Sequence, residues 1–83
     1  MSIEVSKSRI EFTIDRLLQV WEDDIANDKN TVNGVGLMHQ RIEGGIEALR
    51  IAGVISNERK SKIFAEMNKQ YARRINELMK VAA

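Results

Sequence analysis

Apolar side chains recur every three or four residues along three stretches of the chain. In the first stretch they are Ile10, Ile14, Leu17, Leu18, Trp21 and Ile25. Such a stripe is typical of an amphipathic helix that buries one face. Ser8 and Glu11 have the spacing of a capping box, in which each side chain bonds the backbone N–H of the other residue. We therefore predict a helix over residues 8–27, followed by a polar, turn-forming loop. Phe12 lies off the stripe and is the best candidate for an exposed apolar contact.

A second stripe predicts a helix over residues 34–53, with its apolar positions at Val35, Met38, Ile42, Ile46 and Leu49. Gly44 and Gly45 lie in its middle, where two glycines cost roughly 2 kcal/mol relative to two alanines. They indicate a close approach of another backbone, a kink, or a weakened helix with no special role. Gly53 fits the C-terminus of this helix.

The third stripe predicts a helix over residues 56–81, with apolar positions at Ile63, Met67, Tyr71, Ile75 and Leu78. Ser56 is a good N-cap, and the negative charge of Glu58 suits the first turn. The joint between Gly53 and Ser56 is short, so the second and third helices should be antiparallel neighbours.

Three amphipathic helices predict an all-α fold for one domain, residues 1–83: a small three-helix bundle, or a helical hairpin with an N-terminal helix. The first and third helices look longer than the second, so part of their stripes would overhang. We expect a homodimer to cover this overhang. The residues assigned to the core or the dimer seam are Trp21, Met67, Tyr71, Ile75 and Leu78, with Trp21 or Met67 near the seam.

The composition argues against a catalytic or metal-binding site. The chain has no cysteine and a single histidine, His39, which leaves few ways to build a zinc site or an activated nucleophile. We expect no catalytic site, no metal and no cofactor, and therefore a protein that is not an enzyme. His39 is interpreted as a structural residue at the surface or half-buried. Gly34 and Gly36 do not form a phosphate-binding loop.

Hydropathy places the chain in an aqueous compartment. No apolar run approaches the ~20 residues that span a bilayer. The first residues lack the apolar core of a signal peptide. We expect a cytoplasmic protein without a membrane partner.

Charge is sorted along the chain. Residues 1–30 carry seven acids and four bases, whereas residues 56–83 carry seven bases and three acids. The sorting indicates an acidic first segment beside a basic last segment, or a basic face that is kept for a partner. The acids near residue 24 could be a solvated face, a contact with a basic surface, or ligands of a hard cation. The candidate partner-binding residues are Glu22, Asp23, Asp24, Asp28, Arg59, Lys60, Lys62, Arg73 and Arg74.

A basic helix after a short glycine-containing turn is also the arrangement of helix-turn-helix DNA-binding domains. Against this interpretation, the bases of the third helix are spaced around the helix as well as along it. The isoelectric point of about 8.1 is below the value of roughly 9 that is usual for nucleic-acid-binding domains.

These features together favour a non-enzymatic module that binds another protein. Short, cysteine-free helical chains without catalytic groups are common among accessory proteins of phages and plasmids, which often inhibit or modulate a larger host protein. The alternative is a nucleic-acid-binding regulator that uses the basic third helix.

Overall fold

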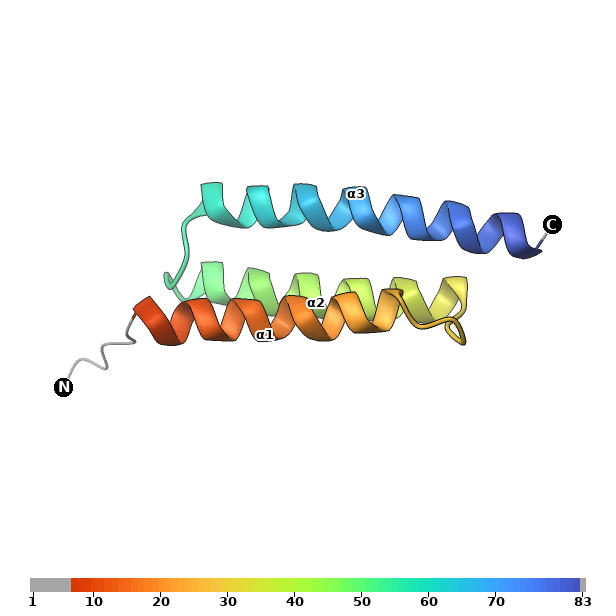
Figure 1. Ribbon diagram of the computed structural model, residues 1–83. Helices are drawn as coiled ribbons and strands as arrows, with labels where there is room; N and C mark the ends of the chain where they lie inside the picture. Colours follow the sequence, from red (N-terminus) through yellow and green to blue (C-terminus); the bar gives the residue numbers. More distant parts are fainter. Residues whose placement is uncertain (1–6, 83) are drawn as a thin grey trace.

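The computed structural model describes the backbone of residues 7–82 and the side chains of residues 8–80. It contains three helices, α1 (Lys7–Ile25), α2 (Val32–Ile51) and α3 (Asn57–Ala82), and no strand in the described part of the chain. The predicted all-α fold with three helices is therefore confirmed. α1 and α3 run in the same direction, and α2 runs antiparallel to both (Figure 1). Of the helices within residues 7–82, none is both long and apolar enough to cross a bilayer.

The start of α1 differs from the prediction. The helix begins at Lys7, so Ser8 lies inside the first turn and does not precede it as an N-cap. The helix ends at Ile25, which leaves Asp28 in the following loop.

The start of α2 also differs from the prediction, because the helix begins at Val32 and not at residue 34. Thr31 has an extended backbone, and its hydroxyl accepts a hydrogen bond from the Gly34 N–H at 3.0 Å. This is an N-cap that satisfies one of the free N–H groups of the first turn. The prediction left Val32 and Asn33 in the loop, but the cap extends the helix over both of them.

The joint between α2 and α3 has the two features that the sequence predicted, a glycine at the end of α2 and a serine cap on α3. Gly53 has a φ of +75°, in the left-handed region that favours glycine. Its N–H donates to the Arg50 carbonyl and the Val54 N–H donates to the Leu49 carbonyl, both at 2.9 Å. This pair of bonds is a Schellman motif. The Ser56 hydroxyl then accepts from the Arg59 N–H at 3.0 Å and caps α3.

Gly44 and Gly45 do not interrupt α2, which is one helix of 20 residues. A methyl group on Gly45 would lie 3.5 Å from both terminal methyl groups of Leu17, so this glycine faces α1. A methyl group on Gly44 would meet no atom within 4 Å. Of these two glycines, only Gly45 therefore marks a contact between helices of the same chain.

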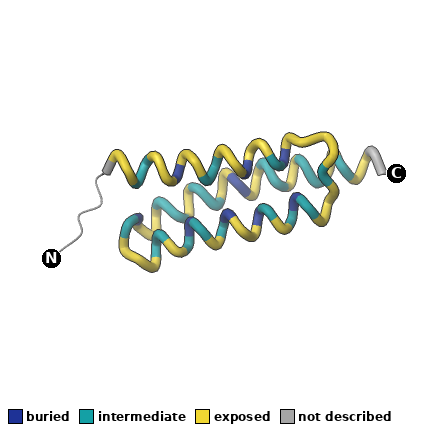
Figure 2. Tube along the Cα trace, turned by 90° about the horizontal axis from the view of Figure 1, so that it is seen from below, coloured by how far each residue is buried: buried dark blue, intermediate teal, exposed yellow. Residues whose placement is uncertain are grey.

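The core forms where α2 lies against both α1 and α3, and the buried residues fall on the facing sides of the helices (Figure 2). Tyr71, Ile75 and Leu78 are partly buried against it. The core consists of Ile14, Trp21, Ile25, Val35, Ile42, Ile46, Ile55 and Met67.

Trp21 and Met67 are each only 1% exposed within one chain. Their burial therefore needs no second copy. The helix lengths also differ from the expectation behind the homodimer, since α1 has 19 residues, α2 has 20 and α3 has 26. Within residues 7–82 only α3 is longer than α2, so the expected overhang of α1 was wrong.

His39 lies in this core and is only 6% exposed, not at the surface or half-buried as expected. The indole N–H of Trp21 donates to Nδ1 of His39 at 3.1 Å. Because the indole can only donate, Nδ1 must accept, and the ring proton is on Nε2. Nε2 lies 3.0 Å from Oδ1 of Asn68. The Tyr71 ring stacks on the imidazole with centroids 4.2 Å apart. These contacts satisfy the buried ring and join all three helices.

Candidate protein-binding surfaces

An ion pair joins the acidic first helix to the basic third helix. The two terminal guanidinium nitrogens of Arg59 lie 2.5 and 2.7 Å from the two carboxylate oxygens of Glu11. Hydrogen bonding to Glu11 raises the pKa of Arg59, and the nearby charge of Asp15 adds to this shift. At this position the sorted charge does bring an acidic segment beside a basic one.

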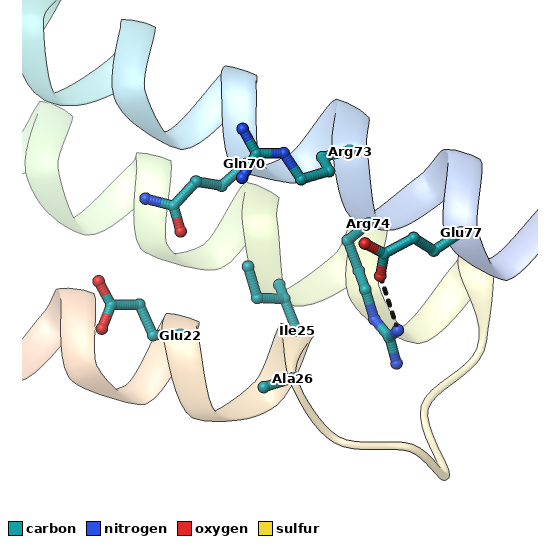
Figure 3. Close-up of a pocket in the computed structure, with 7 residues that line it drawn as sticks. All are labelled: Glu22, Ile25, Ala26, Gln70, Arg73, Arg74 and Glu77. Carbon is teal, nitrogen blue, oxygen red and sulfur yellow. Dashed lines mark hydrogen bonds and ion pairs between the residues drawn. The ribbon is translucent and has the colours of Figure 1, made fainter.

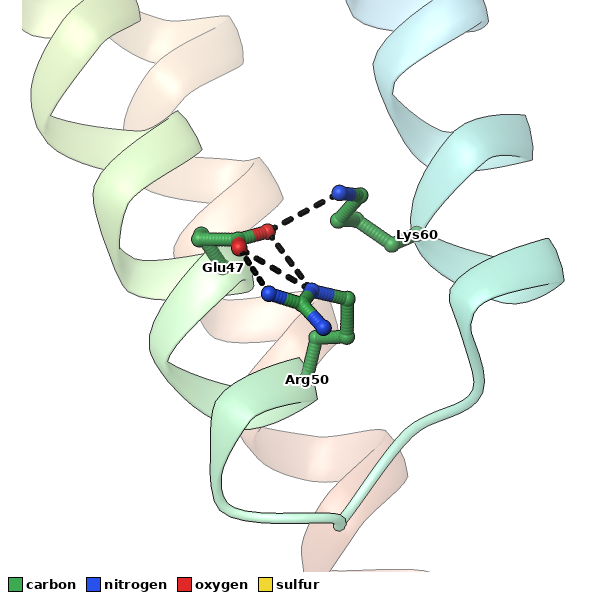
Figure 4. A network of polar contacts seen from close by, with 3 residues as sticks. All are labelled: Glu47, Arg50 and Lys60. Carbon is green, nitrogen blue, oxygen red and sulfur yellow. Dashed lines mark hydrogen bonds and ion pairs between the residues drawn. The ribbon is translucent and has the colours of Figure 1, made fainter.

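A second cluster joins α2 to α3 through Glu47 (Figure 4). The carboxylate of Glu47 accepts from Nε of Arg50 at 2.9 Å and lies 3.0 Å from Nζ of Lys60. The hydrogen bond from Arg50, and next the one from Lys60, lower the pKa of Glu47 to about 2. The Lys60 ammonium also lies 5.6 Å from the centre of the Phe64 ring. Lys60 is therefore engaged within the chain.

Arg74 reaches from α3 toward the end of α1 (Figure 3). One terminal nitrogen lies 3.3 Å from Glu77, and the other donates to the Asn27 carbonyl at 3.2 Å. Three of the five bases predicted to bind a partner, Arg59, Lys60 and Arg74, thus hold the bundle together. The other two, Lys62 and Arg73, are exposed.

The four predicted acids do not converge. Asp23 accepts from the Gln19 amide at 2.8 Å, and Asp24 accepts from the Asn30 amide at 2.8 Å. Glu22 and Asp28 are exposed. Within the described residues, no three acidic or histidine side chains are grouped so that they could hold a metal ion.

A groove separates α1 from α3, since the close helix contacts of both are mainly with α2. One section encloses about 260 Å³ over a floor of Leu18, Trp21, Ile63 and Met67. The next section encloses about 480 Å³ near Ile25, Arg73 and Arg74 (Figure 3). Both sections share Glu22 and Gln70, so they form one continuous feature. We call it the α1–α3 groove.

A second surface lies on the side of α2 that faces away from the core. Leu37, Arg41, Gly44, Ala48 and Ile51 recur at steps of four and three residues, so they share one helix face. All five are exposed, Leu37 by 59% and Ile51 by 71%. We call this face the α2 outer stripe. This face was not predicted from the sequence, because the prediction rested on the opposite stripe of this helix, which includes Val35, Ile42 and Ile46.

The α2 outer stripe borders a shallow pocket of about 450 Å³ at the start of α2. Its lining includes Val32, Gly36, Leu37 and Tyr71. Phe12, on α1, is 71% exposed as the sequence predicted, and it lies outside both surfaces.

No family model, curated protein or solved structure matches this chain.

Proposed function

We propose that this chain is a non-enzymatic module that binds another protein through the α2 outer stripe. The observation that carries the proposal is the exposed apolar pair Leu37 and Ile51 on either side of Gly44. Apolar side chains that are exposed together commonly mark protein-interaction sites. Arg41 is the one charge among the five residues of the stripe.

The spacing of the stripe suits a helical partner. Leu37 and Ile51 are two heptads apart, or about 21 Å at 1.5 Å per residue. Gly44 lies midway and has no side chain, so another backbone can approach closely there. An amphipathic helix with apolar residues every three or four positions would match this surface. A large apolar side chain of that helix could enter the pocket beside Leu37.

This binding mode agrees with an accessory role, in which a small protein inhibits or modulates a larger one by covering a helix. Such a role requires no catalytic group on this chain. The small size and simple architecture of the chain support the same view, as they do for many accessory proteins of phages and plasmids.

The test begins with capture of a protein from a nuclease-treated lysate of the cells that encode this chain. The captured protein is then purified, and its affinity is measured by calorimetry. We expect Leu37→Glu and Ile51→Glu each to weaken binding by at least about tenfold, because each puts a charge into an apolar contact.

Phe12→Glu is the matched control, since it makes the same kind of change at an equally exposed apolar residue on α1. It should bind as the unchanged chain does. Equal affinity of all variants would contradict the proposal, as would recovery of a partner only when nucleic acid is left intact.

A second candidate function is nucleic-acid binding, which one observation favours. Lys62, Lys69, Arg73 and Lys80 recur at steps of seven, four and seven residues, so they share an exposed face of α3. Four phosphate contacts would give a salt slope of about −3.6 for duplex DNA, from about −0.9 per contact. Tight, sequence-dependent binding to a duplex at physiological salt, lost in Lys69→Glu, would support this function over the first.

A further inference from the structure

The α1–α3 groove has walls of opposite charge at matching heights. α1 and α3 run in the same direction, with Glu11 beside Arg59 and Asn27 beside Arg74. Those partners are 48 and 47 residues apart in sequence. A residue of α1 is therefore level with the residue of α3 that is about 48 positions later.

The α1 wall is acidic. Glu11, Asp15, Leu18 and Glu22 recur at steps of four, three and four residues and share one helix face. This face is directed toward α3, because Glu11 pairs with Arg59 and Leu18 and Glu22 line the groove. With Glu11 neutralised by its partner, Asp15 and Glu22 leave two negative charges on this wall.

The α3 wall is net basic. Lys62 and Arg73 line the groove and are exposed, and Glu66 lies between them. Arg74 is paired with Glu77. The wall therefore keeps one net positive charge. By the offset of 48, Asp15 is level with Lys62 to within one residue, and Glu22 with Arg73 to within three, or about 4.5 Å.

We infer that the α1–α3 groove binds a second copy of this chain about a two-fold axis parallel to the helices. That axis places α1 of each copy against α3 of the other, in the same direction and at the same height. Both contacts then join an acidic wall to a net basic one. An axis perpendicular to the helices would instead place α1 against α1 and bring the acidic walls together. Charge complementarity thus selects the parallel arrangement.

The apolar floor supplies the attraction that charges at the rim do not. Leu18 and Ile63 are half-buried in one chain and lie within three residues of the same level. In the parallel dimer, Leu18 of each copy would face Ile63 of the other copy across the floor of the groove. Burial of Leu18 and Ile63 favours association, whereas the rim charges set orientation and partner choice. This dimer goes beyond the proposed function, because it uses the opposite side of the bundle from the α2 outer stripe.

Sedimentation equilibrium of the purified chain tests the dimer. At tens of micromolar and low salt we expect twice the chain mass of 9.5 kDa. The dissociation constant should rise by at least about fivefold in ~0.5 M sodium chloride, where charges more than a few ångströms apart are screened. A mass of 9.5 kDa at all concentrations would overturn the inference.

Charge reversal tests the arrangement. Glu22→Lys and Arg73→Glu should each raise the dissociation constant by about tenfold at low salt, because each dimer then holds two like-charged contacts. An equimolar mixture of the two variants should recover association to within about threefold of the unchanged chain. In that mixed dimer one contact is native and the other has both charges exchanged.

Asp23→Lys is the matched control, since it makes the same change next to Glu22 but outside the groove lining. It should leave association close to that of the unchanged chain. Glu66→Gln should tighten the dimer, because Glu66 accepts a hydrogen bond from Gln70 but is the one acid of the described α3 wall without an ion pair. Single reversals that associate as the unchanged chain does, or a mixture with no recovery, would rule out the parallel arrangement. Loss of association in Leu37→Glu alone would move the interface to α2.

Discussion

Replacing Gly44 with alanine should stabilise the free chain. A glycine inside a helix costs roughly 0.5–1 kcal/mol relative to alanine, because the unfolded glycine has more backbone freedom to lose. At Gly44 the added methyl group meets no atom within 4 Å, so no steric cost offsets this gain. We expect the full gain of up to about 1 kcal/mol, which is about fivefold in the ratio of folded to unfolded chains. In a domain of this size it corresponds to a rise of about 4–8 °C in Tm.

Two other glycines provide controls of opposite sign. Gly53→Ala places an L-residue at a φ of +75° and should destabilise by roughly 1–2 kcal/mol. Gly34→Ala would put a methyl group 2.1 Å from Oδ1 of Asn30. That oxygen accepts from the Thr31 N–H, so the collision would disturb the loop before α2. Gly34→Ala should therefore destabilise as well.

The assay is urea unfolding followed by far-ultraviolet circular dichroism. It is run at low protein concentration in ~0.5 M salt, so that any association does not contribute to the measured stability. We expect Gly44→Ala to raise the midpoint and leave the m-value unchanged. A lower midpoint for Gly44→Ala, or no loss for Gly53→Ala, would refute the reasoning. If a partner helix crosses at Gly44, the same variant should be more stable alone and yet bind that partner less tightly.

Three further predictions concern named contacts. Ser56→Ala removes the cap on the Arg59 N–H and should lower the free energy of unfolding by about 1 kcal/mol in the same urea assay. Trp21→Phe leaves Nδ1 of His39 without its donor and should cost roughly 1–3 kcal/mol, with a change in the imidazole nitrogen-15 shifts in NMR spectra as the second readout. The pKa of Glu47 is lower in the folded chain, at about 2, than its ordinary value of 4.5, so its contribution to stability is present above pH 4.5 and is lost as the pH falls toward 2. Glu47→Gln should therefore lose less stability than the unchanged chain between these pH values, measured by chemical unfolding at each pH; an identical loss would contradict the assignment.

Local features of the sequence determined much of the fold. The apolar stripes identified the three helices and their buried sides, because the period of 3.6 residues depends only on residues within the same segment. Gly53 and Ser56 marked the joint between α2 and α3 for the same reason, since a left-handed C-terminus and a hydroxyl cap involve only nearby backbone. Where two local signals competed, the prediction of the helix start was wrong. Asn33 suggested a loop, but the Thr31 cap begins α2 at Val32 and holds Asn33 inside the helix.

Contacts between distant segments were decided only by the tertiary structure. His39 gave no sign of its burial, because its partners Trp21 and Asn68 are 18 and 29 residues away and lie on other helices. The sorted charge showed that α1 and α3 could attract one another, but not that Glu11 and Arg59 would meet. The α1–α3 groove depends on how both helices lie against α2. A helix period fixes which side chains share a face, whereas the packing of three helices fixes what each face meets, and so which surfaces remain open to a partner.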